Sequence, residues 1–72
     1  MKSTDAVRNR VYVQCSEMER KVKGWIITKQ DNVMEVEMPT GFVMTMHRKT
    51  KRSPFIMRVG LVEFYSDGKE IS

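Results

Sequence analysis

The chain has 72 residues and a formal net charge of +4, with 13 lysine and arginine residues against 9 aspartate and glutamate residues. This length fits one domain with a thin core and leaves little room for a deep catalytic cleft. The sequence has no apolar stretch of membrane-spanning length, no signal-peptide pattern and only one cysteine, Cys15. We therefore expect a cytoplasmic protein with no internal disulfide, no membrane association and an anionic partner.

Residues 1–6 are expected to be flexible, and after them apolar residues recur with period two, which is typical of β-strands. Residues that favour turns separate the alternating segments. Five strands are predicted, over residues 7–15, 21–29, 33–38, 42–48 and 55–65. An open sheet of this size would leave two exposed edges, so the pattern predicts an all-β domain closed into a small five-stranded barrel. The alternation is compatible with an OB-like barrel and, as an alternative, with an SH3-like barrel.

The second predicted strand has the composition of a stacking platform. Lys21, Lys23 and Lys29 alternate onto one face together with Trp25. An exposed aromatic ring among lysines suits the bases and phosphates of single-stranded nucleic acid. In the alternative interpretation Trp25 packs into the core and the lysines line its rim. Gly24 within this strand predicts a bulge or a sharp bend of the barrel.

The strongest local feature is a basic loop that follows the fourth predicted strand. Arg48, Lys49, Lys51 and Arg52 lie close together there, and no acidic residue occurs between residues 38 and 62. In the functional interpretation the loop contacts phosphates and releases counterions, and in the alternative it is a solvated hairpin tip. The candidate nucleic-acid-binding residues are Lys21, Lys23, Trp25, His47, Arg48, Lys49, Lys51, Arg52, Phe55 and Arg58.

Residues suited to catalysis or metal binding are scarce. His47 is the only histidine, and no second metal ligand or nucleophile accompanies it at a suitable spacing. Cys15 falls on the apolar face of the first predicted strand, which favours a buried, unreactive thiol. Glu35 and Glu37 share a strand face that we interpret as solvated. We expect neither enzymatic activity nor a metal site nor a cofactor.

Three short motifs in the middle of the chain occur in a recognisable order. They are V-x-G at residues 22–24, N-x-M followed by V-E at residues 32–37, and G-x-V-x-T-x-H at residues 41–47. Over about residues 22–58, this order resembles bacterial translation initiation factor one. The resemblance implies an OB barrel that contacts ribosomal RNA on the small subunit. The RNA-facing positions that it implies are His47, Lys49, Lys51, Arg52 and Arg58.

Two functional hypotheses follow. The first is a barrel that binds RNA or single-stranded nucleic acid through its basic loop, with a role in translation. The second is a phage- or plasmid-type interaction module that docks on the acidic surface of a host nucleic-acid-processing machine. Exposure of Met44, Met46 or Met57 as an adaptable contact surface would favour the second. In either case the protein is a monomer or a dimer formed through open strand edges.

Overall fold

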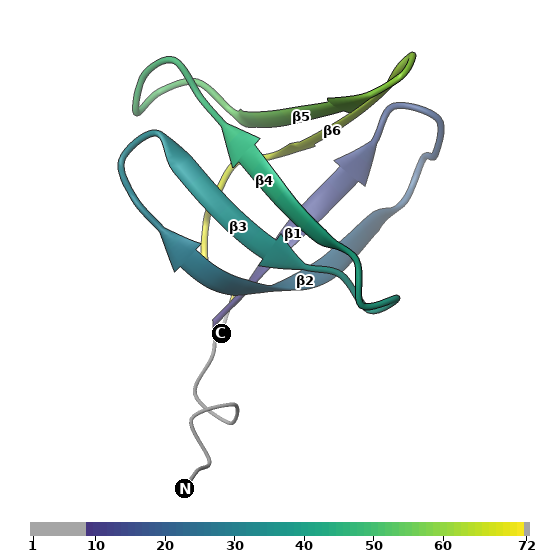
Figure 1. The fold of residues 1–72 in the computed structure, drawn as a ribbon, viewed down its shortest axis with the longest axis horizontal. Coiled ribbons are helices and arrows are strands. Elements are labelled where there is room, and N and C mark those ends of the chain that lie inside the picture. The colour runs from purple at the N-terminus through teal and green to yellow at the C-terminus, as the bar shows by residue number, and fades with distance from the viewer. Residues whose placement is uncertain (1–8, 72) are drawn as a thin grey trace, which may run out of the picture.

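The computed structural model describes residues 9–71, which form six β-strands and no helix. The strands are β1 (Arg10–Cys15), β2 (Lys21–Lys29), β3 (Val33–Glu37), β4 (Val43–His47), β5 (Phe55–Val59) and β6 (Val62–Ser66). Successive strands pair in antiparallel fashion, and β6 pairs with β1, so the sheet closes into a barrel (Figure 1). The predicted fold class, a small all-β barrel, is confirmed.

The segment predicted as one strand over residues 55–65 is two strands joined by a tight turn. β5 and β6 pair as far as Val59 and Val62, so only Gly60 and Leu61 lie between them. Gly60 has a φ of 62°, a conformation that two-residue hairpin turns require and that glycine adopts without steric cost. The barrel therefore has six strands, and the prediction of five is wrong.

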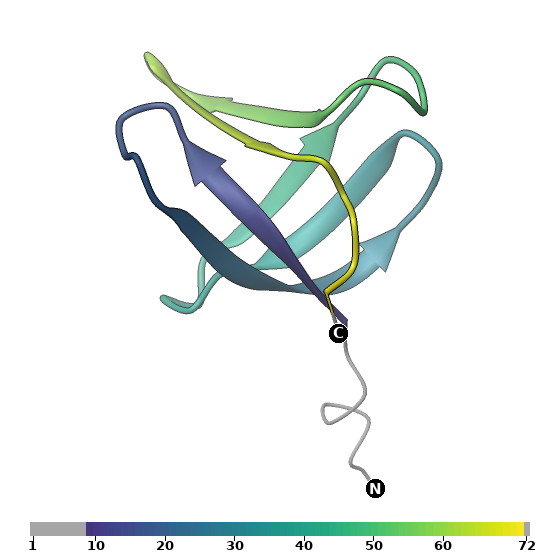
Figure 2. The same cartoon turned by 180° about the vertical axis from the view of Figure 1, so that it is seen from behind.

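The strand order is sequential around the whole barrel, as the opposite view also shows (Figure 2). Sequential pairing defines an up-and-down barrel, whereas the OB fold is a five-stranded Greek-key barrel. Alternation in the sequence could not distinguish these arrangements, because it reports which face a residue occupies and not which strand lies beside it.

The core is built from alternate residues of the strands. One face of each of β1, β3 and β4 turns inward, and the apolar side chains on these faces fill the interior. Since the barrel is narrow, unbranched methionine side chains can adapt to its irregular volume. The buried hydrophobic residues are Val11, Val13, Met34, Val36, Met44, Met46 and Phe55.

Gly24 lets β2 cross closely over β3. A Cβ atom built on Gly24 would lie 2.4 Å from Cγ1 of Val36 and 3.0 Å from Sδ of Met38. Only glycine therefore permits this approach, which supports the predicted bend of the barrel. The backbone keeps its regular register at this position, so no bulge occurs there.

The bulge lies further along β2, between Ile26 and Thr28. The extra residue reverses the alternation, because a one-residue shift moves every later side chain to the opposite face. Lys29 consequently pairs with the inward-facing Met34 and leaves the face that carries Trp25. The prediction that Lys29 shares a face with Trp25 is wrong.

The C-terminal segment covers one end of the barrel. The amide of Ile71 donates to the carbonyl oxygen of Arg10 at 2.8 Å, and Nζ of Lys29 donates to the carbonyl oxygen of Gly68 at 2.7 Å. A Cβ on Gly68 would lie 2.7 Å from the ring of Phe55. The chain thus packs directly against the largest buried side chain and shields it from solvent.

The flexibility predicted for residues 1–6 and the start of the first predicted strand at residue 7 lie outside the described residues. Between residues 9 and 71, no helix has the length and apolarity needed to cross a bilayer.

Candidate nucleic-acid interface

The outer face of β1 and β2 combines an aromatic ring with two cations. Tyr12 pairs with Lys23 across the two strands and is 38% exposed. Nζ of Lys21 lies 5.7 Å from the centroid of the Tyr12 ring, and Nζ of Lys23 lies 6.0 Å from it. Both distances are within the limit of about 6 Å for cation–π attraction, so the two lysines place positive charge beside an accessible ring.

Trp25 extends this face toward the N-terminal end of β1. It pairs with Arg10 across the strands, and its side chain is half-buried. Arg10, Trp25 and the two lysines line a shallow hollow together with Pro39 from the β3–β4 turn. Trp25 therefore lies on the outer surface with Lys21 and Lys23, as predicted, with part of its ring covered.

A second hollow lies between Tyr12 and Tyr65. Its volume is about 240 Å³, and Lys21 of β2 and Pro54 at the end of the basic loop also line it. Tyr65 reaches this position because Gln14 of β1 pairs with it across the β1–β6 seam. Asp67 also lines the hollow, and its carboxylate accepts a hydrogen bond from the amide of Lys69 at 2.9 Å. Two tyrosine rings and a lysine around one hollow offer a place for a nucleic-acid base next to a phosphate-binding charge.

The basic loop, defined here as residues 48–54, displays three cations to solvent. Lys49 and Arg52 are exposed, and their side chains have no polar partner among residues 9–71. Lys51 lies 3.9 Å from Asp31, but the two side chains are 73% and 81% exposed, so this pair is weak. These three side chains remain available to an anionic ligand.

Arg48 has a structural role instead. Its Nε donates to the carbonyl oxygen of Asp31 at 2.5 Å, and its Nη1 donates to that of Lys51 at 3.4 Å. Its guanidinium carbon lies 4.3 Å from the centroid of the Phe55 ring. Because these contacts join the β2–β3 turn, the basic loop and the core, Arg48 stabilises the fold, and its contact with phosphate stays a prediction.

Phe55 is also a core residue and not a stacking platform. Its side chain is 0% exposed, with the Arg48 guanidinium on one side and Gly68 on another. Burial follows from its place in β5, where Phe55 and Met57 turn toward the interior. The position directly after the basic loop suggested exposure, but the strand alternation decides the direction of the side chain.

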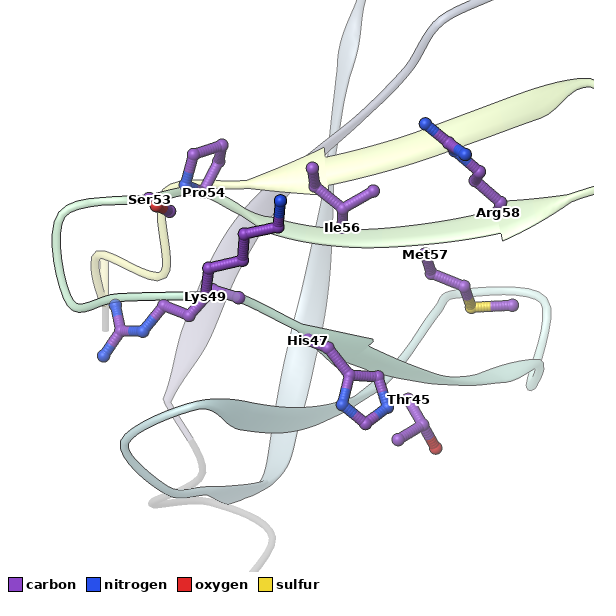
Figure 3. Close-up of a pocket in the computed structure, with 9 residues that line it drawn as sticks. Thr45, His47, Lys49, Ser53, Pro54, Ile56, Met57 and Arg58 are labelled. Carbon is purple, nitrogen blue, oxygen red and sulfur yellow. The ribbon is translucent and has the colours of Figure 1, made fainter.

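His47 and Arg58 line a groove between β4 and β5. The groove has a volume of about 880 Å³, and its wall includes Thr45, Lys49 and Met57 (Figure 3). His47 is exposed and has no polar side-chain partner among the described residues. Arg58 turns toward β6, where its Nε donates to Glu63 at 2.7 Å, so its charge is partly neutralised.

The paired residues of five strands connect these features in one outward-facing row. Lys21 is opposite Gln14, which is opposite Tyr65, and the row continues through Ile56 to His47. The β2 platform and the basic loop, which are distant in sequence, therefore flank a common surface. Sequence patterns alone do not place Tyr12 and Tyr65 at one site, because only the β1–β6 pairing brings these two rings together.

Glu35 and Cys15 are the remaining residues that the sequence analysis considered for chemistry. Glu35 accepts a hydrogen bond from Oγ1 of Thr28 at 3.3 Å on the outer face of the barrel. The Cys15 thiol is half-buried and accepts a weak hydrogen bond from the amide of Glu17. Within residues 9–71, no group of three histidine, cysteine or acidic residues is placed to hold a metal ion.

Comparison of the chain with protein-family models, with curated proteins and with solved structures gives no significant match.

Proposed function

We propose that this protein binds single-stranded nucleic acid, preferably RNA, on the surface that runs from Tyr12 to the basic loop. The observation that carries the proposal is the hollow between Tyr12 and Tyr65, which Lys21 borders and which Pro54 joins to the loop. A base would stack on the tyrosines while its phosphates contact the neighbouring cations.

The charge distribution supports an extended polyanion as the ligand. Lys21 and Lys23 lie on one side of the hollow, and Lys49, Lys51 and Arg52 extend from the loop on the other. A flexible single strand can follow such a path, whereas separate cations of this kind do not form a compact pocket for a small anion. The resemblance to bacterial translation initiation factor one favours RNA over DNA.

The burial of the methionines weakens the alternative hypothesis, in which the protein is a docking module. Met44 is 3% exposed and Met46 is 0% exposed, so both belong to the core. Met57 is half-buried against that core. The methionine exposure that would favour a docking module is therefore absent from β4.

The decisive experiment is a titration of the full chain with labelled single-stranded RNA and DNA, followed by anisotropy and by Trp25 fluorescence. Tyr12→Ala and Tyr65→Ala should each weaken binding roughly 5- to 150-fold, because a stacked base contributes about 1–3 kcal/mol. Tyr12→Phe keeps the ring and should bind nearly as the parent does.

Phe42→Ala is the matched control, because Phe42 is an exposed aromatic residue, 50% accessible, in the β3–β4 turn and outside the proposed surface. Its affinity should equal that of the parent. Equal losses in the Tyr12 and Phe42 variants, or no binding to any oligonucleotide at low salt, would contradict the proposal.

A further inference from the structure

Among residues 9–71, the least paired seam of the barrel wall lies between β4 and β5. β4 pairs with β3 along its whole length, but it pairs with β5 only where His47 meets Ile56. Beyond that point the two strands diverge, and the groove between them is lined by Thr45, Met57 and Arg58 (Figure 3). A closed barrel normally leaves no free strand edge, and this seam has the fewest residue pairs of the six in the described barrel.

The register shows which backbone groups of β4 face the seam. The amide of Met38 donates to Phe42, and the amide of Arg48 donates to Asn32, at the two ends of the β3–β4 hairpin. Hydrogen-bonded pairs alternate along antiparallel strands, so Met44 also bonds to β3. The N–H and C=O groups of Val43 and Thr45 therefore point away from β3, toward the seam.

The same alternation applies to β5. His47 directs its backbone groups toward β5 and meets Ile56 there. Two residues further on, Arg58 must direct its N–H and C=O groups toward the seam as well. At this level, β3 pairs with β4 and β6 pairs with β5, but within residues 9–71 no strand pairs with either of them on the side that faces the seam. The seam thus presents alternating donors and acceptors at strand spacing.

We propose that this seam binds an acidic, extended peptide segment of a partner protein, which adds a strand to the edge of β4. Backbone hydrogen bonds to Val43 and Thr45 would supply affinity, as in other cases of β-strand addition. Alternate side chains of the peptide would point to opposite faces. One set would meet Met57, which packs against the core. The other set would lie on the outer surface beside His47 and Lys49.

The charge of the surface around the seam favours an acidic peptide as its ligand. No acidic residue lies between residues 38 and 62, so carboxylates on the outward side of the added strand would meet only cations and neutral groups from β4, the basic loop and β5. A second copy of this chain would instead bring its own basic β4–β5 segment against the first, which like-charge repulsion disfavours. A nucleic-acid backbone cannot donate hydrogen bonds to the carbonyl groups of Val43 and Thr45 through its phosphates.

This site is separate from the hollow between the two tyrosines, so the two proposals can fail independently. The test uses the isotope-labelled full chain and a short synthetic peptide of alternating valine and glutamate. Binding should slow amide hydrogen exchange at Val43 and Thr45 at least about tenfold, because these amides would become hydrogen-bonded. The amides of Met44 and Met46, which already bond to β3, should change little.

Two peptide controls test the mode of binding without altering the protein. Methylation of alternate peptide nitrogens removes the pairing hydrogens and should weaken binding at least about tenfold. A peptide of valine and lysine should not bind. Among protein variants, Lys49→Glu should weaken binding of the acidic peptide several-fold, whereas Lys23→Glu, on the opposite part of the barrel wall, should not.

Several outcomes would overturn the proposal. They are unchanged exchange at Val43 and Thr45, equal binding of the methylated peptide, and protection by an oligonucleotide but not by the peptide. Protection that rises with protein concentration alone would show that a second copy occupies the seam, which also refutes an acidic partner segment.

Discussion

Arg48 and Lys49 are adjacent in a loop of uniform charge, yet they have different environments. Arg48 contacts two carbonyl oxygens and the Phe55 ring, while the Lys49 side chain has no polar partner among residues 9–71. The difference arises because the Arg48 backbone is still paired, through its amide, with Asn32 of the β2–β3 turn. A basic run can therefore contain both a cation held by contacts within the fold and a cation that is exposed to solvent.

This contrast predicts different effects on stability. Arg48→Ala should lower the free energy of unfolding by about 1–2 kcal/mol, because it removes charge-assisted hydrogen bonds and a cation–π contact. Lys49→Ala should change it by less than about 0.5 kcal/mol. Urea denaturation of both variants tests the difference, and an equally small loss in both would show that Arg48 does not stabilise the loop.

Gly24 provides a second prediction at the level of one residue. Gly24→Ala places a methyl group 2.4 Å from Cγ1 of Val36, so β2 and β3 must separate or the core must shift. The expected loss is about 1–3 kcal/mol of unfolding free energy, which is usual for overpacking. Lys23→Ala, one residue earlier and exposed, is the control and should cost less than about 0.5 kcal/mol. A neutral Gly24→Ala substitution would contradict the close approach.

Among the elements, the β5–β6 hairpin depends most clearly on one turn. Gly60→Val should destabilise the protein by more than about 1 kcal/mol, because a β-branched residue is strained at the positive φ of this position. Gly60→Asn should cost less, since asparagine tolerates the left-handed region. Leu61→Ser should be nearly neutral, because the leucine is 98% exposed. Thermal unfolding of the three variants would test this order.

Some features of the strands could be predicted from sequence patterns, and others could not. The inward faces of β1 and β3 and the β3–β4 hairpin were predictable, because polar and apolar residues alternate cleanly there and Gly41 marks the turn. The split at Gly60 was missed because the surrounding run is apolar on both sides. The bulge after Ile26 left no signal, since both of its neighbours are compatible with a strand.

The candidate site was predictable in part for related reasons. The exposure of Lys21, Lys23 and the loop lysines follows from charge, which disfavours burial. To predict that Phe55 points inward, one must know where β5 starts. To predict that Tyr12 lies near Tyr65, one must know that β1 pairs with β6. Long-range pairing of this kind is not encoded in any single segment.

At the scale of the whole molecule, the proposed binding surface predicts a defined salt dependence. Five cations, Lys21, Lys23, Lys49, Lys51 and Arg52, are expected to contact phosphates of the single strand. The slope of log affinity against log salt should then be about −3.5, since each phosphate contact on a single strand contributes about −0.7.

Removal of two of these cations tests the expected number of phosphate contacts. The double variant Lys51→Gln/Arg52→Gln should reduce the slope to about −2. Arg58→Gln is the control, because Arg58 already pairs with Glu63 and is not counted among the phosphate contacts. A slope that does not change in the double variant would show that the loop does not touch the nucleic acid.

The hydrogen bond between Ile71 and Arg10 holds the C-terminal segment beside the start of β1 (Figure 1). A circularly permuted chain is therefore feasible, in which a short linker joins these two positions and new termini open at Leu61, in the exposed β5–β6 turn. For the same geometric reason, residues 9–71 could be inserted as a module into a surface loop of another protein, since the entry and exit points lie side by side.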